Sequence, residues 1–195
     1  MSDWPEIYVL RHGQTEWNRQ GRWQGDLDSP LTPEGQAQAE AMGRLLADLG
    51  VTPASHHFYT SPLGRARRTA ALALAAQGTK GSAIEDARLR EISVGRWTGR
   101  TRDEIVHESG LAADAHFLEF YAAAPGGESF AEIAGRAEAF LSGLAGPAVV
   151  VTHGITSRFL RLVALGWGMA RLAELPGGQG VIHRVHAGRH EELAP

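Results

Sequence analysis

The chain has 195 residues, 43% of them hydrophobic and 21% charged, which is typical of one globular domain that buries a core. A formal net charge of −3 argues against general attraction to nucleic acid or to an anionic membrane, so we expect neither as a partner. The absence of cysteine excludes disulfides, thiolate nucleophiles and cysteine-ligated metal sites.

No stretch of the sequence indicates export or membrane insertion. Residues 1–6 lack the basic and apolar regions of a signal peptide. The longest purely aliphatic run, residues 70–76, is too short to span a bilayer. We therefore expect a cytoplasmic protein. The oligomeric state stays open, and a homodimer is one expectation.

The first predicted strand runs into residues that can bind an anion. Residues 7–10 are apolar and favour a β-strand, and Arg11, His12 and Gly13 follow directly. In open α/β sheets, ligands bind in the crevice outside the carboxyl ends of the strands. Arg11 and His12 are therefore predicted to belong to an anion site.

A loop and a helix are predicted next. Residues 18–30 are rich in glycine, aspartate and proline, which is typical of a loop. Thr32 and Pro33 then predict the start of a helix with one apolar face, and Gly50 predicts its end.

Residues 57–60 form a second short strand candidate. Ser61 and Pro62 predict the N-cap and first turn of another helix, which runs to about Gln77. A third short strand is predicted around Ile84.

The middle of the chain is predicted to be mostly helical. Thr101 begins a capping box and so predicts a helix start, and residues 111–124 also look helical. Residues 125–127 interrupt the pattern with Pro-Gly-Gly. Ser129 begins a second capping box, which predicts a helix to about Leu144.

Residues 148–152 are the clearest buried strand, and His153 and Gly154 follow it. A helix is predicted from about Thr156 to Leu165. Residues 181–185 are a last strand candidate, and residues 187–195 are predicted to be a mobile tail.

Strands alternate with helices, and the best strands are continuous apolar runs. This pattern predicts an α/β fold, a three-layer α/β/α sandwich with a mostly parallel central sheet. We find no linker that would divide residues 1–195 into two domains.

The strand ends carry a set of residues suited to a phosphoryl group. If the strands are parallel, His12, Arg11, Arg65 and His153 converge on one edge of the sheet. Guanidinium groups match phosphate oxygens, and a neutral imidazole can act as a nucleophile near neutral pH. Flanking cations disfavour imidazolium and keep His12 neutral. A phosphorylated His12 is therefore chemically reasonable.

The leaving oxygen needs a proton, so a carboxylic acid should lie nearby. Glu91 is the best candidate, because it lies in a glycine-flanked irregular segment where side chains can face a cleft. Asp26, Asp28 and Glu128 compete with it.

Together these motifs resemble the histidine phosphatase superfamily, in its phosphoglycerate mutase-like branch (branch 1). The motifs lie in the family's order, and they are residues 11–18 (RHGQTEWN), 61–66 (SPLGRA), 89–91 (LRE), 95–99 (GRWTG), 125–129 (PGGES) and 151–154 (VTHG). The resemblance covers residues 7–165.

The resemblance implies His12 as the phosphorylated nucleophile and Glu91 as proton donor and then base. It also implies a phosphate pocket and a set of residues near the substrate. The pocket residues are Arg11, Arg65 and His153, helped by Asn18, and the substrate-binding residues are Gln24, Gly25 and Gly154. The family uses no metal or other cofactor, and the segment at about residues 100–130 is its variable lid.

Some residues keep two interpretations. His183, His186 and His190 have a spacing that would suit a metal site on a helix, but their segment is predicted as strand and loop, so we expect no metal. Four aromatic residues are either core or leaving-group pocket, namely Trp97, Phe117, Phe120 and Tyr121.

We therefore predict a phosphomonoester hydrolase that acts through phosphohistidine on a small phosphorylated metabolite. The alternative is a phosphoglycerate mutase, an isomerase, which needs a pocket for a second anionic group. Arg100 and Arg102 are present, but residues 111–124 contain no lysine or arginine, so hydrolysis is favoured. A binding module without activity is a third hypothesis, and the complete set of site residues argues against it.

Overall fold

The computed structural model describes residues 4–195. Residues 1–3, which belong to the segment where no signal peptide is expected, lie outside the described residues. Within residues 4–195, no helix is both long and apolar enough to cross a membrane.

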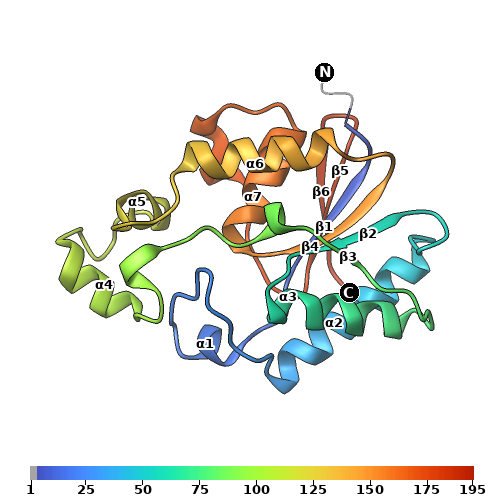
Figure 1. Ribbon diagram of the computed structural model, residues 1–195, viewed down its shortest axis with the longest axis horizontal. Helices are drawn as coiled ribbons and strands as arrows, with labels where there is room; N and C mark the ends of the chain where they lie inside the picture. The colour runs from blue at the N-terminus through green and yellow to red at the C-terminus, as the bar shows by residue number, and fades with distance from the viewer. Residues whose placement is uncertain (1–3) are drawn as a thin grey trace.

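A six-stranded sheet in the order β3-β2-β4-β1-β5-β6 occupies the centre of the described chain (Figure 1). Its strands are β1 (Ile7–Arg11), β2 (His57–Thr60), β3 (Ile84–Glu85), β4 (Ala148–Thr152), β5 (Ile182–His186) and β6 (Arg189–Leu193). The first four strands of this order pair in parallel, whereas β5 pairs antiparallel with both β1 and β6. The predicted α/β fold with a mostly parallel sheet is confirmed.

Helices cover both faces of the sheet, α2 and α3 on one and α6 and α7 on the other (Figure 1). The α-helices are α1 (Glu16–Arg19), α2 (Pro33–Asp48), α3 (Gly64–Ala76), α4 (Arg102–Ser109), α5 (Phe117–Ala123), α6 (Phe130–Ser142) and α7 (Gly154–Ala164). Three short 3₁₀ helices are η1 (Ala87–Leu89), η2 (Gly95–Trp97) and η3 (Met169–Glu174).

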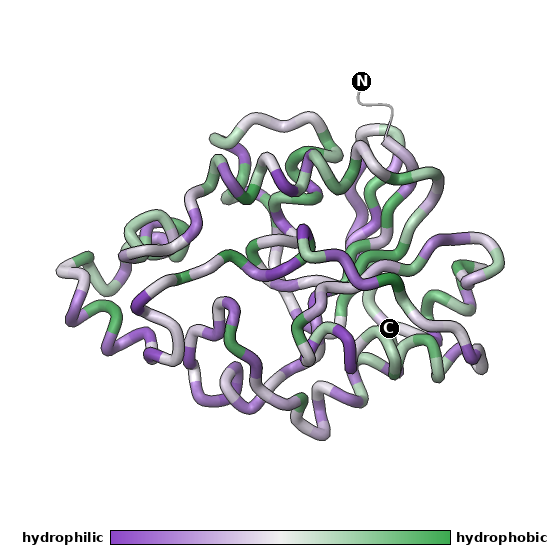
Figure 2. Tube along the Cα trace, in the orientation of Figure 1, coloured by the Kyte–Doolittle hydropathy of each residue, from purple (hydrophilic) through white to green (hydrophobic). Residues whose placement is uncertain are grey.

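Alternation along the strands divides the core in two. Ile7 and Val9 of β1 pack with residues of α6 and α7, whereas Tyr8 and Leu10 pack with residues of α2 and α3. Successive strand residues point to opposite faces, so one strand serves both layers. Figure 2 shows hydrophobic residues concentrated along these central strands. The predicted three-layer arrangement follows from this division.

The carboxyl ends of three strands meet at one edge of the sheet. Arg11 of β1 lies opposite Thr152 of β4, and Thr60 of β2 lies opposite Val151. The residues that follow these strands are therefore brought together, as the sequence predicts.

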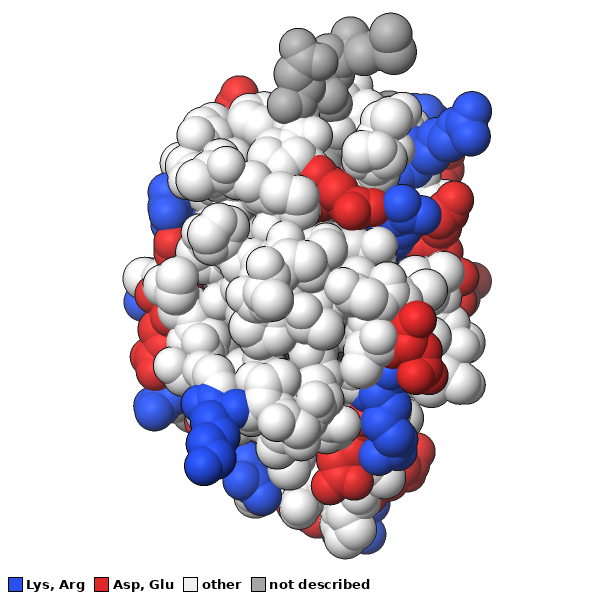
Figure 3. Space-filling view, turned by 90° about the vertical axis from the view of Figure 1, so that its right-hand side faces the viewer, with Lys and Arg blue, Asp and Glu red and all other residues white. Residues whose placement is uncertain are grey.

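Residues 94–128 form an excursion from the body of the protein, and its two ends meet. At their base, Glu128 N donates to the Ser93 carbonyl over 2.9 Å, and Arg96 N donates to the Pro125 carbonyl over 3.1 Å. The backbone of Gly95 has φ +49°, and a Cβ there would lie 2.2 Å from the Pro125 oxygen. Helices α4 and α5 lie on this excursion, at the left of Figure 1. The opposite end of the molecule presents a largely uncharged centre with charged residues around it (Figure 3).

The C-terminal tail is not the mobile segment that was predicted. Residues 189–193 form strand β6, in which His190 pairs with Val185 of β5. Ala187 and Gly188, with φ 49° and 73°, make the turn, as in a two-residue hairpin loop. Strand β6 lies at the edge of the sheet. Edge strands often carry charged residues, and such a polar sequence resembles a loop.

The helix predicted from Ser61 begins later, at Gly64, and its N-cap residue Leu63 makes no side-chain cap. The cap comes instead from Asp28, whose Oδ1 accepts from Arg65 N over 3.1 Å. A capping residue far away in the sequence leaves no pattern in the residues around the helix start. The predicted start at Ser61 was wrong for this reason.

The helix predicted over residues 111–124 is confined to Phe117–Ala123. The carbonyl oxygens of Ala113 and Ala115 accept from Arg102 Nη2, over 3.1 and 3.2 Å. A side chain thus replaces helical N–H donors before α5 begins, which the local composition does not reveal.

Candidate active site

His12 is buried just after β1, with 2% of its surface exposed. Its backbone N–H donates to the Thr152 carbonyl over 2.9 Å, which ties it to β4. Its ring Nδ1 lies 2.8 Å from the Gly13 carbonyl oxygen. A carbonyl oxygen only accepts, so Nδ1 carries the proton and Nε2 keeps a lone pair.

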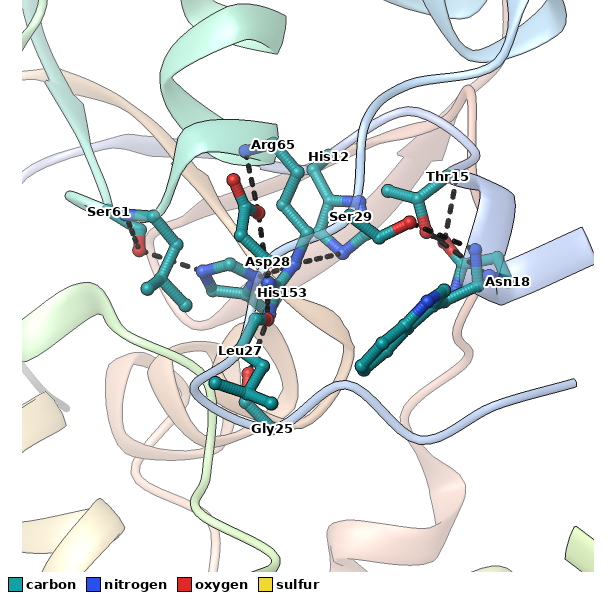
Figure 4. Close-up of polar contacts among 12 residues, drawn as sticks. His12, Thr15, Asn18, Gly25, Leu27, Asp28, Ser29, Ser61, Arg65 and His153 are labelled. Atoms are coloured by element: carbon teal, nitrogen blue, oxygen red, sulfur yellow. Dashed lines mark hydrogen bonds and ion pairs between the residues drawn. The ribbon is translucent and has the colours of Figure 1, made fainter. Parts of the chain in front are cut away.

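Arg65 lies between His12 and His153 (Figure 4). Its Nε is 3.3 Å from His12 Nε2 and 3.2 Å from His153 Nδ1. A guanidinium only donates, so both nitrogens present lone pairs to it. His153 Nε2 therefore carries a proton and donates to Ser61 Oγ over 2.8 Å. The sequence placed Ser61 only in a helix cap and missed this contact.

Burial and positive charge keep both imidazoles neutral. Burial lowers the pKa of His12 well below its ordinary value, and the Arg65 and Arg11 guanidiniums lower it further. Burial also lowers the pKa of His153, and the Arg65 guanidinium lowers it further. His12 is therefore a neutral imidazole with a lone pair on Nε2, the form that a nucleophile needs.

The remaining donors of Arg65 are mostly bound by the loop before α2. Nη1 donates to the Leu27 carbonyl over 2.6 Å and to Asp28 Oδ1 over 3.3 Å, and Nη2 donates to the Gly25 carbonyl over 2.8 Å. Gly64 makes room for this arrangement, because a Cβ there would lie 2.1 Å from Asp28 Oδ2. Of the predicted site residues, Gly25 thus contacts Arg65 directly.

Arg11 has its donors free. Within residues 4–195 its guanidinium makes no hydrogen bond, and its Nε is buried without a partner. Gly154 lies beside it, since a Cβ there would be 3.5 Å from Arg11 Cζ and 3.6 Å from Glu91 Oε2. A guanidinium fork binds a phosphate group bidentately, so Arg11 is a ready partner for an anion.

The Glu91 carboxylate lies at the N-terminus of α7. Its Oε1 accepts from the backbone N and the Oγ1 of Thr156, each over 3.1 Å, and its Oε2 accepts from Ile155 N over 3.3 Å. Helix α7 begins at Gly154, two residues before the predicted start, and this places the helical N–H groups against Glu91.

The competing carboxylates lie elsewhere. Asp28 binds Arg65, and Glu128 pairs with Arg136 over 2.6 Å. Asp26 and Glu128 line a small cavity of about 150 Å³ that does not include His12. Among the four candidates, Glu91 is the one that lines the cavities beside His12.

Two adjoining cavities lie at the strand ends. The inner cavity is about 310 Å³ and holds most of the predicted residues, namely Arg11, His12, Asn18, Gln24, Gly25, Arg65 and Glu91. The outer cavity is about 270 Å³, shares Arg11, Trp23, Glu91, Arg102 and Tyr121 with the inner one, and adds Gly154 and Arg158. The structure thus brings the predicted site residues together, while His153 lies behind Arg65.

Aromatic rings form the wall of the outer cavity. Trp23 and Tyr121 stack with ring centroids 4.2 Å apart, and Phe117 also lines the cavity. Trp97 and Phe120 are instead buried in the core. The four aromatic residues left open by the sequence thus divide equally between the two interpretations.

The sequence missed Arg158, which also faces the outer cavity. Its Nη1 donates to the Gly154 carbonyl over 3.1 Å, and its guanidinium lies 4.8 Å from the Phe117 ring centroid. Its position one helical turn after Gly154 is a signal that could have found it.

Asn18 and Gln24 complete the inner cavity. Asn18 belongs to α1, a short helix at the start of the predicted loop, and forms a capping box with Thr15. Gln24 is 8% exposed, and within residues 4–195 its buried Oε1 has no hydrogen-bond partner.

The C-terminal histidines lie away from these cavities. His190 Nε2 lies 3.2 Å from His183 Nδ1 and 3.2 Å from Arg161 Nη1. His186 is exposed at the end of β5. Over the described residues 4–195, no group of three or more His, Asp or Glu side chains is placed to hold a metal ion.

The fold and the site define an α/β protein with a pocket of guanidinium and imidazole groups at the carboxyl edge of its sheet. The family model described as "Histidine phosphatase superfamily (branch 1)" matches residues 7–193. The chain belongs to this superfamily, and the resemblance predicted from the motifs is confirmed.

Curated relatives and solved structures agree with this assignment. A probable phosphoglycerate mutase GpmB from Klebsiella pneumoniae is 39% identical over 167 residues, 83% of this chain and 75% of the relative. The structure of a mycobacterial glucosyl-3-phosphoglycerate phosphatase matches with a TM-score of 0.80 at 29% identity, over 97% of this chain and 98% of the other. The structure of a Thermus thermophilus protein, TTHB049, matches with a TM-score of 0.71 at 35% identity, over 97% and 99%.

Proposed function

We propose that the protein hydrolyses phosphoric monoesters of small metabolites through a phosphohistidine at His12. The observation that carries the proposal is the neutral His12, with its Nε2 lone pair among the guanidinium and imidazole groups of Arg11, Arg65 and His153. Membership in the superfamily and similarity to a phosphatase support it. The cytoplasmic location and the homodimer stay predictions.

The reaction has two steps. In the first, His12 Nε2 donates its lone pair to phosphorus, the N–P bond forms, and the P–O bond to the leaving group breaks. Protonated Glu91 gives its proton to the leaving oxygen. In the second step, a water oxygen attacks phosphorus, Glu91 takes a water proton, and the N–P bond breaks to release phosphate.

Positive charge and N–H donors stabilise the transferring group in both steps. The side chains proposed to hold the phosphoryl oxygens are Arg11, Arg65 and Asn18, with His153 as their electrostatic partner behind Arg65. The residues proposed to contact the rest of the substrate are Gln24, Gly25 and Gly154. We also propose that the chain is a single catalytic domain, in which the segment at about residues 100–130 serves as the lid.

One observation favours a second candidate, a phosphoglycerate mutase. Residues 111–124 contain no lysine or arginine, but Arg102 and Arg158 both line the outer cavity. The pocket therefore has more positive charge for a second anionic group than the sequence predicts. The mutase relatives add support. A faster interconversion of 2- and 3-phosphoglycerate than hydrolysis, with a bisphosphate primer, would reverse our preference.

The test is phosphoenzyme labelling with a ³²P-labelled monoester. Wild-type protein should carry an acid-labile, base-stable label and hydrolyse p-nitrophenyl phosphate, and His12→Ala should do neither. The matched control is His107→Ala, at an exposed position on α4, which should keep both properties. A label that survives in His12→Ala would refute the proposal. No hydrolysis by the wild-type protein at any pH would favour a binding module.

A further inference from the structure

A side chain from the C-terminal part of the chain reaches the loop that carries His12. Gln179 lies between η3 and β5, and its Nε2 is 2.9 Å from Asn18 Oδ1. The same nitrogen is 3.4 Å from the backbone carbonyl oxygen of His12. Gln179 therefore connects two residues of the inner cavity.

The contacts determine which way both amides face. The backbone N of Thr15 lies 3.1 Å from Asn18 Oδ1, and Thr15 Oγ1 lies 3.0 Å from it. A backbone N–H only donates, so the atom of Asn18 that faces Thr15 must be the oxygen. The atom of Gln179 that faces this oxygen, and also faces the His12 carbonyl, must then be Nε2.

This arrangement leaves the amide nitrogen of Asn18 available. A carbonyl oxygen has two lone pairs, and Oδ1 already accepts from Thr15 and Gln179. Across residues 4–195, Asn18 Nδ2 makes no hydrogen bond, and Asn18 lines the cavity with His12 and Arg11. Nδ2 can therefore donate to an anion there, and rotation of the amide would turn an N–H group toward the Thr15 N–H.

We propose that Gln179 is a positioning residue, which holds the Asn18 amide so that Nδ2 donates to the phosphoryl oxygens. The proposal rests on the phosphoryl chemistry proposed above and adds a determinant outside the ordered motifs. Gln179 itself does not hold the phosphoryl group and acts through Asn18.

The loop that carries Gln179 is anchored from α7. Arg158 Nε donates to the Leu175 carbonyl over 3.1 Å, and Arg161 Nη2 donates to the Pro176 carbonyl over 2.7 Å. After Gln179 the chain enters β5, whose Ile182 pairs with Leu10 of β1. The loop thus has fixed points on both sides of Gln179, which suits a residue that orients another.

The test compares Gln179→Met, Asn18→Ala and the double variant. Calorimetry gives the affinity for inorganic phosphate, and p-nitrophenyl phosphate turnover gives kcat and KM. Losing a hydrogen bond to a charged group should cost Asn18→Ala roughly tenfold to a hundredfold in phosphate affinity. Gln179→Met should lose about tenfold by the same reasoning. The double variant should bind no more weakly than Asn18→Ala, because Gln179 acts through Asn18.

Gln36→Met is the matched control, since Gln36 lies on α2 and lines neither cavity; it should bind phosphate like the wild type. Wild-type affinity in Gln179→Met, or losses that add in the double variant, would overturn the proposal. If Gln179→Met does not fold, Gln179→Glu replaces it, because glutamate has the same length and no N–H group. The phosphate affinity of Gln179→Glu is then compared with and without Asn18→Ala.

Phosphate binding separates this proposal from the proposed function. A wild-type protein that forms phosphohistidine, with Gln179→Met binding phosphate normally, would remove only the role of Gln179. A wild-type protein that binds phosphate without forming phosphohistidine would refute the proposed function, and coupling between Gln179 and Asn18 would still support the positioning role.

Discussion

Arg65 donates its Nε–H to Nε2 of His12 over 3.3 Å, the atom that we propose attacks phosphorus. That lone pair cannot bind Arg65 and phosphorus at once. His153 Nδ1, at 3.2 Å from the same Nε, offers the N–H group another acceptor when the N–P bond forms. The second histidine can therefore keep Arg65 in place while the nucleophile reacts.

The acidic limb of the pH–rate profile should report His12. Because the pKa of His12 is lowered well below its ordinary value by burial, Arg65 and Arg11, kcat/KM should persist below about pH 6.5, the ordinary histidine value. Arg11→Met removes one cation, raises the pKa of His12 and should move this limb to higher pH. Profiles of both proteins, with Arg19→Met as an exposed control, test this. An acidic limb that does not move in Arg11→Met would contradict the expectation.

Glu91→Gln should separate substrates by their leaving groups. Loss of general acid catalysis costs roughly 10²–10⁴-fold, and the cost should be greatest for alkyl phosphates, whose leaving oxygen needs a proton. p-Nitrophenyl phosphate should lose less, since its leaving group is already stable as an anion. Single-turnover rates on both substrates measure this, with Asp26→Asn as the control. Equal losses on both substrates would argue against Glu91 as the acid.

Two glycines on helices should respond oppositely to alanine. A Cβ at Gly64 would displace the Asp28 carboxylate, 2.1 Å away, so Gly64→Ala should lose the cap on α3 and about 1 kcal/mol of unfolding free energy. A Cβ at Gly135 in α6 would meet no atom of residues 4–195 within 4 Å, so Gly135→Ala should add about 0.5–1 kcal/mol.

Urea unfolding measures both changes. If the Gly64 effect comes through Asp28, then Gly64→Ala and Asp28→Ala should not be additive. A Gly64→Ala protein as stable as the wild type would show that Asp28 contributes little to the start of α3.

Stability should fall in acid in part because His183 is buried. Burial, then Arg161 and His190, lower the pKa of His183 to about 3, whereas in the unfolded chain it is about 6.5. Between these values the unfolded state binds more protons. The contribution is therefore fully present above about pH 6.5 and is lost as pH falls, with a slope of up to about 1.4 kcal/mol per pH unit.

His183→Gln should flatten this dependence of the unfolding free energy on pH, measured by urea titrations over the acidic range. His107→Gln, at an exposed position, should keep the wild-type slope. Parallel curves for the wild type and His183→Gln would rule out His183 as the source.

The sequence predicts the site best where chemistry directly follows a strand. His12 and His153 were found because residues 7–10 and 148–152 are apolar runs that end in them, and parallel pairing brings such ends together. Arg65 is predicted from its place shortly after the strand candidate at residues 57–60. These relationships are local, so each segment carries its own signal.

Contacts between residues far apart in the sequence leave no local sequence pattern. The Asp28 cap on α3 and the reach of Gln179 to Asn18 join residues 37 and 161 positions apart. The hydroxyl of Ser61 can cap a helix or accept a hydrogen bond from His153. Only the first role can be predicted from the sequence, because His153 comes close to Ser61 only in the folded chain. The polar β6 resembled a loop because its partner strand, rather than its composition, orders it.

The closed base of residues 94–128 has a consequence for how this protein can change. Since Ser93 and Glu128 are hydrogen-bonded to each other, we expect that exchange of residues 94–128, with their core side chains kept, would leave β1, β4 and α7 in place. A graft from a relative with another substrate should then alter leaving-group preference while phosphohistidine formation persists. Substitutions in residues 94–128 can therefore change substrate preference during evolution, while the residues that form the phosphohistidine stay the same.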